Sequence, residues 1–213
     1  MVSVASITPS CRPSMRLVAP VHTVRYERKA HAPPHADPDA AETTKFVPNI
    51  PKGTNWTDRP DPGSVVLVQA PEGPLSVALI GDIMVTRLKL RGIRGVVVDG
   101  RIRDVESCAA CCEDGKFQVW SHGFSAAAPS LNTVPWAVDV PLQFGSSSVK
   151  PGDILCADEG DRAVIVIPRE LLHKVLELLP KLKEASDNVL EDVRNGLTLP
   201  NAIKRHPNFY SNY

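Results

Sequence analysis

The sequence has no apolar run long enough to cross a membrane. One of its strongest runs, residues 163–167, is five residues long, whereas a membrane-spanning helix needs about 18. Net charge is missing too, because 24 Lys and Arg balance 24 Asp and Glu, so no overall field attracts nucleic acid or a lipid surface. Aromatic residues make up only 5%. We therefore expect no membrane and no nucleic acid among the partners, and any recognition to be local.

Cysteine is too sparse and too unevenly placed for a disulfide framework. Cys108, Cys111 and Cys112 form a cluster, while Cys11 and Cys156 lie far from it in sequence. The cluster has ligands for zinc or thiols for redox chemistry, but no second pair with ligand spacing follows, and positions i, i+3 and i+4 share one helix face. Small buried residues are the favoured interpretation. A reducing, cytoplasmic location is expected, with a weak transit-peptide composition at the amino terminus as the alternative.

What is present is the composition of an ordinary globular chain. With 213 residues, 43% hydrophobic and 23% charged, it is neither disordered nor collagen-like. The length favours one large domain, which we place at residues 16–198, between an unassigned segment, 1–15, and a tail, 199–213. Twelve of the 20 prolines fall in the first 74 residues. Residues 28–63 lack a sustained period and are predicted to form a Pro-rich insertion loop.

Short apolar runs separated by turn residues predict strands that alternate with helices. Strands are expected at 17–25, 65–69, 75–80 and 95–98, and then at 117–121, 136–144, 154–157 and 163–167. Helices are expected at 83–91 and 105–113, with a turn at Asp99-Gly100. This order predicts an α/β fold with a mixed sheet.

After Pro168 the chain becomes helical. One apolar stripe at helical spacing is formed by Leu172, Val175, Leu176, Leu179 and Leu182. We assign the stripe to the core or to a subunit contact. Pro180 lies within it and is expected to kink or interrupt the helix.

The chemically informative feature is Gly81-Asp82, followed after twenty residues by Arg103-Asp104. Each dipeptide lies just beyond the carboxyl end of a predicted strand, and the crossover between these strands places both strand ends at one edge of the sheet. Crevices at that edge are where open α/β sheets bind ligands. Arg103 can supply a fixed cation there. Asp104 can supply a hard oxygen ligand for Mg²⁺ or Mn²⁺.

The helix that follows Asp82 offers an anion site. The amides of Ile83 and Met84 lack acceptors within the helix, and with the helix dipole they can hold a carboxylate or phosphate. A purely structural interpretation stays open. Asp82 and Asp104 both stand where a helix N-cap is expected, which stabilises a helix by about 1 kcal/mol without any chemistry, and Arg103 can simply pair with one of them.

Four segments carry a resemblance to a known family: residues 17–24, 79–84, 91–104 and 149–158. They resemble the RraA-like family, which includes the regulator of ribonuclease activity A and the 4-hydroxy-4-methyl-2-oxoglutarate/4-carboxy-4-hydroxy-2-oxoadipate aldolases. An aspartate, twenty residues and Arg-Asp form the signature of the aldolase branch, which Asp82 and Arg103-Asp104 match. Residues 49–53 and 167–171 are similar to fungal members.

The resemblance implies a swivelling β/β/α fold, with mixed sheets, flanking helices and a carboxy-terminal helical segment, in a homotrimer or hexamer with active sites between subunits. It implies a pyruvate aldolase that depends on a divalent metal, Mg²⁺ or Mn²⁺, cleaves 4-hydroxy-4-methyl-2-oxoglutarate-type 2-oxo acids and decarboxylates oxaloacetate. The implied roles are Asp104 as metal ligand, Asp82 and Arg103 as catalytic residues, and Gly81, Ile83, Met84 and Arg103 in substrate binding.

Other functions remain as alternatives. The chain resembles a protein-binding regulator in the same family, and the same site suits a related lyase redirected to another 2-oxo acid. Arg87, Arg91 and Arg94 form a basic helix stripe, for which a solvated face is the favoured interpretation over nucleic-acid contact. His122, expected on a loop, is a candidate phosphorylated histidine, with a solvated side chain as the favoured interpretation.

Overall fold

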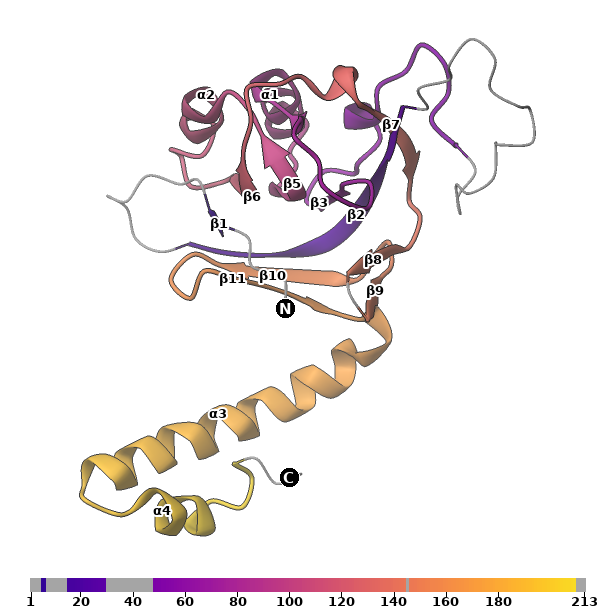
Figure 1. Ribbon diagram of the computed structural model, residues 1–213. Helices are drawn as coiled ribbons and strands as arrows, with labels where there is room; N and C mark the ends of the chain where they lie inside the picture. Colours follow the sequence, from indigo (N-terminus) through magenta and orange to yellow (C-terminus); the bar gives the residue numbers. More distant parts are fainter. Residues whose placement is uncertain (1–4, 7–14, 30–47, 145, 210–213) are drawn as a thin grey trace. The chain divides into compact units, whose positions relative to one another are not determined.

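The computed structural model describes residues 5–6, 15–29, 48–144 and 146–209 (Figure 1). The chain divides into two units, Met1–Pro168 and Arg169–Tyr213. The predicted tail and insertion loop lie partly outside the described residues, as does most of the segment 1–15. The predicted domain of residues 16–198 covers most of the first unit and the long helix of the second, and its boundaries remain a prediction.

The first unit contains a mixed sheet of nine described strands. Its path runs β1-β6-β5-β3-β2-β10-β11, with β4 paired to β5 and β7 paired to β2. The strands are β1 (Ala5–Ser6), β2 (Arg16–Arg28), β3 (Val65–Gln69), β4 (Ala78–Ile80), β5 (Gly95–Ile102), β6 (Gln118–Phe124), β7 (Thr133–Val138), β10 (Ile154–Asp158) and β11 (Ala163–Ile167). A separate hairpin joins β8 (Leu142–Phe144) to β9 (Ser147–Val149). Strands β2, β3, β5 and β6 run parallel, and β1, β7, β10 and β11 pair antiparallel.

Strand β2 connects two regions of this sheet. Its first five residues pair with β10, and from Val21 onward it pairs with β3 and then with β7. Alternate residues from Leu17 to Val21 are buried, which is the period-two pattern expected of a strand with one buried face. One strand therefore contributes to the pairing of both regions.

Helices cover one face of the parallel strands (Figure 1). They are α1 (Asp82–Leu90) and α2 (Val105–Ala110), and short 3₁₀ turns lie at Trp56–Asp58 and Pro129–Leu131. The other face meets β10 and the β8-β9 hairpin, through a second apolar cluster that includes Leu67, Val97 and Leu155. Parallel strands buried on both faces are continuous apolar runs, and all five residues of β3 are buried.

The second unit is a helical pair. It comprises a 3₁₀ turn, Arg169–Leu171, then α3 (Leu172–Arg194) and α4 (Leu199–Arg205). Ala185 and Ala202 are buried, and His206 Nε2 lies 3.1 Å from Asp192 Oδ2. None of the helices in the described ranges has the length and apolarity that a membrane crossing requires.

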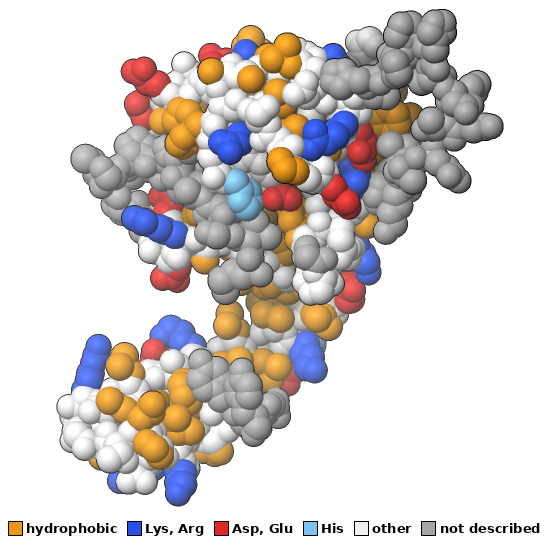
Figure 2. Space-filling model, viewed as in Figure 1, with side chains coloured by type: hydrophobic (Ala, Val, Ile, Leu, Met, Phe, Trp, Pro, Cys, Tyr) orange, Lys and Arg blue, Asp and Glu red, His pale blue; other side chains and the backbone are white. Residues whose placement is uncertain are grey.

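The leucine stripe of α3 is not part of a core. Leu176 is 61% exposed, Leu179 56% and Leu182 44%. Figure 2 shows hydrophobic side chains at the visible surface of this unit. The core assignment was wrong for these three leucines, and the subunit contact stays a prediction. Pro180 does not interrupt α3, which continues over 23 residues, so the hydrogen bond lost at one proline does not end the helix.

Several predicted boundaries were wrong, for reasons of pairing. Asp99-Gly100 is not a turn but lies inside β5, because the strand shifts register after Val98 and continues against β4 and β6. Of the predicted strand 75–80, only Ala78–Ile80 pairs. The predicted strand 136–144 is two strands, separated by Asp139 in the left-handed conformation, φ 53°. His122 lies in β6 and not on a loop.

Candidate functional site

The two predicted dipeptides lie against each other at one edge of the sheet. Gly81 follows β4, Arg103 follows β5, and these strands are parallel neighbours. The amide of Arg103 donates to the carbonyl of Ile80 at 3.1 Å, which holds the two strand ends together. A Cβ placed on Gly81 would lie 2.6 Å from Asp104 Oδ2 and 2.9 Å from Arg103 Nε. Only glycine leaves room for both side chains at this point.

Helix α1 does not begin in the way expected if Asp82 were its N-cap. The N-cap residue is Gly81, with extended backbone, and Asp82 is the first helical residue. Asp82 as an N-cap was therefore wrong. Its Oδ1 accepts a hydrogen bond of 2.7 Å from the amide of Ile83, so the carboxylate occupies one of the amides predicted to hold an anion. A substrate carboxylate reaches that amide only if Asp82 turns aside.

The other residues of this turn differ in exposure. The Ile83 side chain is 76% exposed, and Met84 is half-buried against the core under the helices. The Met84 amide lies in the first turn, where amides have no acceptor within the helix. Of the two predicted anion-binding amides, that of Met84 is the one that Asp82 leaves open.

Asp104 is held in an unusual backbone conformation. It is the N-cap residue of α2, with φ 56° and ψ 47°, a left-handed geometry that Asp and Asn tolerate better than most residues. Its side chain makes no capping hydrogen bond within α2. Oδ2 instead lies 3.0 Å from Arg103 Nε, and both side chains are about one-third exposed. Strained conformations of this kind concentrate at functional sites.

The cysteine cluster lies beneath this turn. Cys108 and Cys112 are fully buried, as the sequence predicted, and Cys111 is partly buried. The Cys108 thiol donates to the carbonyl of Arg103 at 3.5 Å. Burial, followed by nearby thiols and carboxylates, raises the pKa of Cys108 to about 12, so it is a protonated donor that supports the Arg103 backbone.

The donor set suits a cation completed by substrate and water. Within the described ranges no three His, Cys, Asp or Glu side chains gather to hold a metal ion. Mg²⁺ and Mn²⁺ do not need such a cage, because one carboxylate, substrate oxygens and waters complete the coordination. The partly exposed carboxylate of Asp104 fits that role. A cation held by protein side chains alone does not fit.

The basic stripe has structural partners. Arg87 Nη2 lies 2.6 Å from Asp58 Oδ1, and Arg91 Nη2 donates to the carbonyl of Pro60 at 3.2 Å. On the face visible in Figure 2, basic, acidic and apolar side chains are interspersed in the first unit. These two arginines hold the segment before β3 against α1.

The structure also brings together a pair of polar side chains that the sequence analysis did not predict. His122 Nε2 lies 3.0 Å from Asp99 Oδ1, on the neighbouring strands β6 and β5. The sequence signal is that each residue stands two positions after an apolar residue of its strand, Trp120 or Val97, and so shares its face. Two described cavities lie near this pair, and neither is lined by the residues of the Gly81 turn.

The fold and the turn define the class: an α/β protein with a cationic and acidic cluster at the carboxyl edge of its parallel strands. The sequence profile of the RraA-like family, Aldolase/RraA, matches residues 2–166. The chain belongs to this family, which confirms the predicted family and its α/β fold with a mixed sheet, flanking helices and a long carboxy-terminal helix.

Curated relatives share part of the chain. A protein of Halalkalibacterium halodurans named "Putative 4-hydroxy-4-methyl-2-oxoglutarate aldolase" is 34% identical over 130 residues, 61% of this chain and 58% of its own. An uncharacterized protein of Methanocaldococcus jannaschii is 32% identical over 133 residues, 62% of this chain and 60% of its own. The match therefore spans about three-fifths of these relatives.

Solved structures share the fold. An uncharacterized protein from Pseudomonas syringae has a TM-score of 0.67 at 24% identity, over 94% of this chain and 82% of that one. RraAS2 of Streptomyces coelicolor, described as an unusual member of the RNase ES inhibitor RraA protein family, has a TM-score of 0.60 at 22% identity, over 92% and 82% of the two chains.

Proposed function

We propose that this chain is a divalent-metal-dependent pyruvate aldolase. It cleaves 4-hydroxy-4-methyl-2-oxoglutarate-type 2-oxo acids and decarboxylates oxaloacetate. The observation that carries the proposal is the close approach of Gly81 to the side chains of Arg103 and Asp104, which places a guanidinium and a carboxylate beside the start of α1, at the edge where α/β sheets bind ligands. The aldolase name of relatives that match part of this chain supports it.

Arg103 stabilises negative charge that forms during the reaction. Its Nε lies 3.0 Å from Asp104 Oδ2, which holds the guanidinium group beside the proposed cation ligand. A planar, permanently charged donor suits a substrate carboxylate or an enolate oxygen. Charge stabilisation at a preorganised donor is commonly the largest contribution to catalysis of this kind.

Asp104 is the residue that would hold the cation. When bound, Mg²⁺ or Mn²⁺ supplies positive charge that offsets the enolate oxygen. Contact with Arg103 and the left-handed backbone fix the direction of the Asp104 carboxylate before substrate arrives. The Met84 amide adds a donor for the substrate carboxylate.

Asp82 is the proposed base. In retro-aldol cleavage the substrate hydroxyl loses its proton, the bond between C3 and C4 breaks, and its electron pair forms the enolate of pyruvate. Asp82, acting through a water, takes that proton, and protonation of the enolate at C3 completes the reaction. Loss of CO₂ from oxaloacetate gives the same enolate without a hydroxyl proton, so both reactions use one site.

The proposal includes a homotrimer or hexamer. The exposed leucines of α3 and the exposed Ile83 beside the site offer apolar surface to a second copy of the chain. A cytoplasmic location and a fungal source also belong to the proposal, and both rest on the sequence.

An assay of oxaloacetate decarboxylation tests the function directly. Pyruvate formation is expected with Mg²⁺ or Mn²⁺ and is expected to stop in excess chelator. A screen of 4-hydroxy-2-oxo acids then identifies the aldol substrate. A chain that forms no pyruvate from any of them with either metal contradicts the proposal and favours a protein-binding regulator.

A further inference from the structure

A polar row crosses the sheet face opposite the helices. Gln69 of β3 pairs in register with Asp99 of β5, and His122 of β6 lies 3.0 Å from Asp99. Two residues earlier in each strand, the side chains on the same face are apolar: they are Leu67, Val97 and Trp120. The carboxyl ends of three parallel strands therefore present hydrogen-bonding groups beside an apolar surface.

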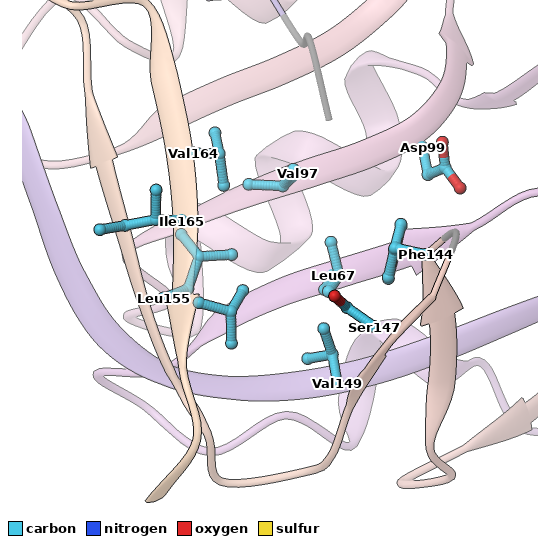
Figure 3. A pocket seen from close by; sticks show the side chains of 10 residues that line it. Leu67, Val97, Asp99, Phe144, Ser147, Val149, Leu155, Val164 and Ile165 are labelled. Atoms are coloured by element: carbon cyan, nitrogen blue, oxygen red, sulfur yellow. The ribbon is translucent and has the colours of Figure 1, made fainter. Parts of the chain in front are cut away.

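Two cavities meet at Asp99. One is an apolar cavity of about 320 Å³, lined by the side chains of β3, β5, β10 and β11 and of the β8-β9 hairpin. The other, about 380 Å³, is polar and is lined by Gln69, Glu72, Arg101, His122 and Gln143 among others. Asp99 lines both. In Figure 3 it stands at one end of the labelled side chains, with Val164 and Ile165 of β11 toward the other end.

Among the described residues that line the apolar cavity, Asp99 is the one with an ionisable side chain. Its side chain is 30% exposed. Burial raises the pKa of its carboxyl group, and contact with His122 and Gln69 works in the opposite direction. His122 engages Oδ1 and Gln69 also hydrogen-bonds the carboxyl group, but a carboxylate has about four acceptor positions, so it can accept a further hydrogen bond from a ligand.

We propose that the apolar cavity binds a small primary amine, with its ammonium group on Asp99 and its hydrocarbon body among Leu67, Val97 and Leu155. An anionic ligand would place its charge against the Asp99 carboxylate. A cationic ligand is attracted to the same carboxylate, and attraction between opposite charges is stronger where water is excluded. The volume falls within the range of small-molecule sites, about 300–1,000 Å³. The site is separate from the Gly81 turn and does not depend on the proposed aldolase activity.

Titration calorimetry on the full chain tests this site with three probes of equal length. Hexylamine is expected to bind at least tenfold more tightly than 1-hexanol, and hexanoate is expected to bind more weakly than both. Equal affinities for the three probes would overturn the proposal, because the charge of the probe would then have no effect. The absence of saturable binding of hexylamine would overturn it as well, because the cavity would then bind no amine.

Two variants and a control locate the binding. Asp99→Asn is expected to lower the affinity for hexylamine at least tenfold and to leave that for 1-hexanol within twofold. Ser147→Phe, at an exposed position on the cavity rim, is expected to weaken both probes while the core stays intact. Glu72→Gln, which alters only the polar cavity, is the matched control and is expected to change neither. Full hexylamine affinity in both Asp99→Asn and Ser147→Phe would place the amine elsewhere.

Discussion

Asp104 has a left-handed backbone beside Arg103, and its carboxylate makes no capping hydrogen bond within α2. We predict that Asp104→Ala abolishes metal-dependent oxaloacetate turnover, because it removes the proposed cation ligand. Asp104→Asn is the companion variant, since asparagine tolerates the left-handed conformation and changes only the charge. Full oxaloacetate turnover by the unaltered protein in excess chelator, or by the Asp104→Ala protein with metal present, would contradict the metal mechanism.

Arg103 contributes a fork of donors where lysine presents a point charge. Arg103→Lys is expected to lower kcat at least tenfold, which corresponds to about 1.4 kcal/mol of transition-state stabilisation. Steady-state kinetics with oxaloacetate measure the effect, and thermal unfolding checks that the fold is unchanged. An unaltered kcat would assign Arg103 a structural role through its contact with Asp104.

Asp82 is expected to matter unequally in the two reactions. Asp82→Asn removes the proton acceptor, while the amide oxygen of the new side chain can still accept from the Ile83 amide and so keep that contact. A general base is typically worth 10²–10⁴-fold, so aldol cleavage should fall by at least ~10² while decarboxylation falls much less. Proton exchange into pyruvate is a third readout. Equal losses in all three reactions, with the metal still bound, would show that Asp82 only positions the site.

At the scale of elements, the junction of β4 with α1 lies against the junction of β5 with α2. Gly81 makes that approach possible, because a Cβ there would collide with Asp104 and Arg103. Gly81→Ala is therefore expected to displace two side chains and no backbone. The free energy of unfolding should change by less than about 1 kcal/mol, while kcat should fall at least about tenfold, since small misplacements of catalytic groups are costly.

The matched control for this prediction is Gly123→Ala. Gly123 lies in β6, and a Cβ there would meet Arg101 Nη1 at 3.7 Å, an ordinary contact. That variant should keep both stability and turnover. If Gly81→Ala retains full activity, or if it unfolds the protein, the close contact does not position the catalytic groups in the way proposed.

At the scale of the whole molecule, the exposed apolar face of α3 is the feature that a single copy leaves uncovered. Leu176, Leu179 and Leu182 are each more than two-fifths exposed, and exposed apolar patches commonly mark contact surfaces. We expect light scattering at micromolar concentration to give the mass of a trimer or hexamer. Leu179→Glu is expected to reduce that mass, with Lys181→Glu as a control on the same helix. A monomeric mass for the unaltered chain would remove the oligomer.

The family and much of the α/β fold could be predicted from the sequence, because local patterns carry them. Period-two runs mark β2, and the buried valines of β3 and β5 form continuous apolar strands. The order strand, helix, strand places the ends of β4 and β5 at one edge, so the proximity of Gly81 to Arg103 and Asp104 followed from chain order and the handedness of crossovers.

Only the tertiary structure decided what depends on a partner strand or on one dihedral angle. The residue types of Asp99-Gly100 predict a turn. In the structure these residues lie within a strand, because pairing with β4 and β6 extends β5 beyond Val98. The left-handed backbone of Asp104 and the side-chain conformation in which Asp82 accepts from the Ile83 amide are choices of single dihedral angles, which the residue types allow but do not impose. The pairing of Asp99 with His122 depends on the register of β5 against β6. Alternation within each strand gives the face of each residue, but the register is set by contacts between residues far apart in sequence.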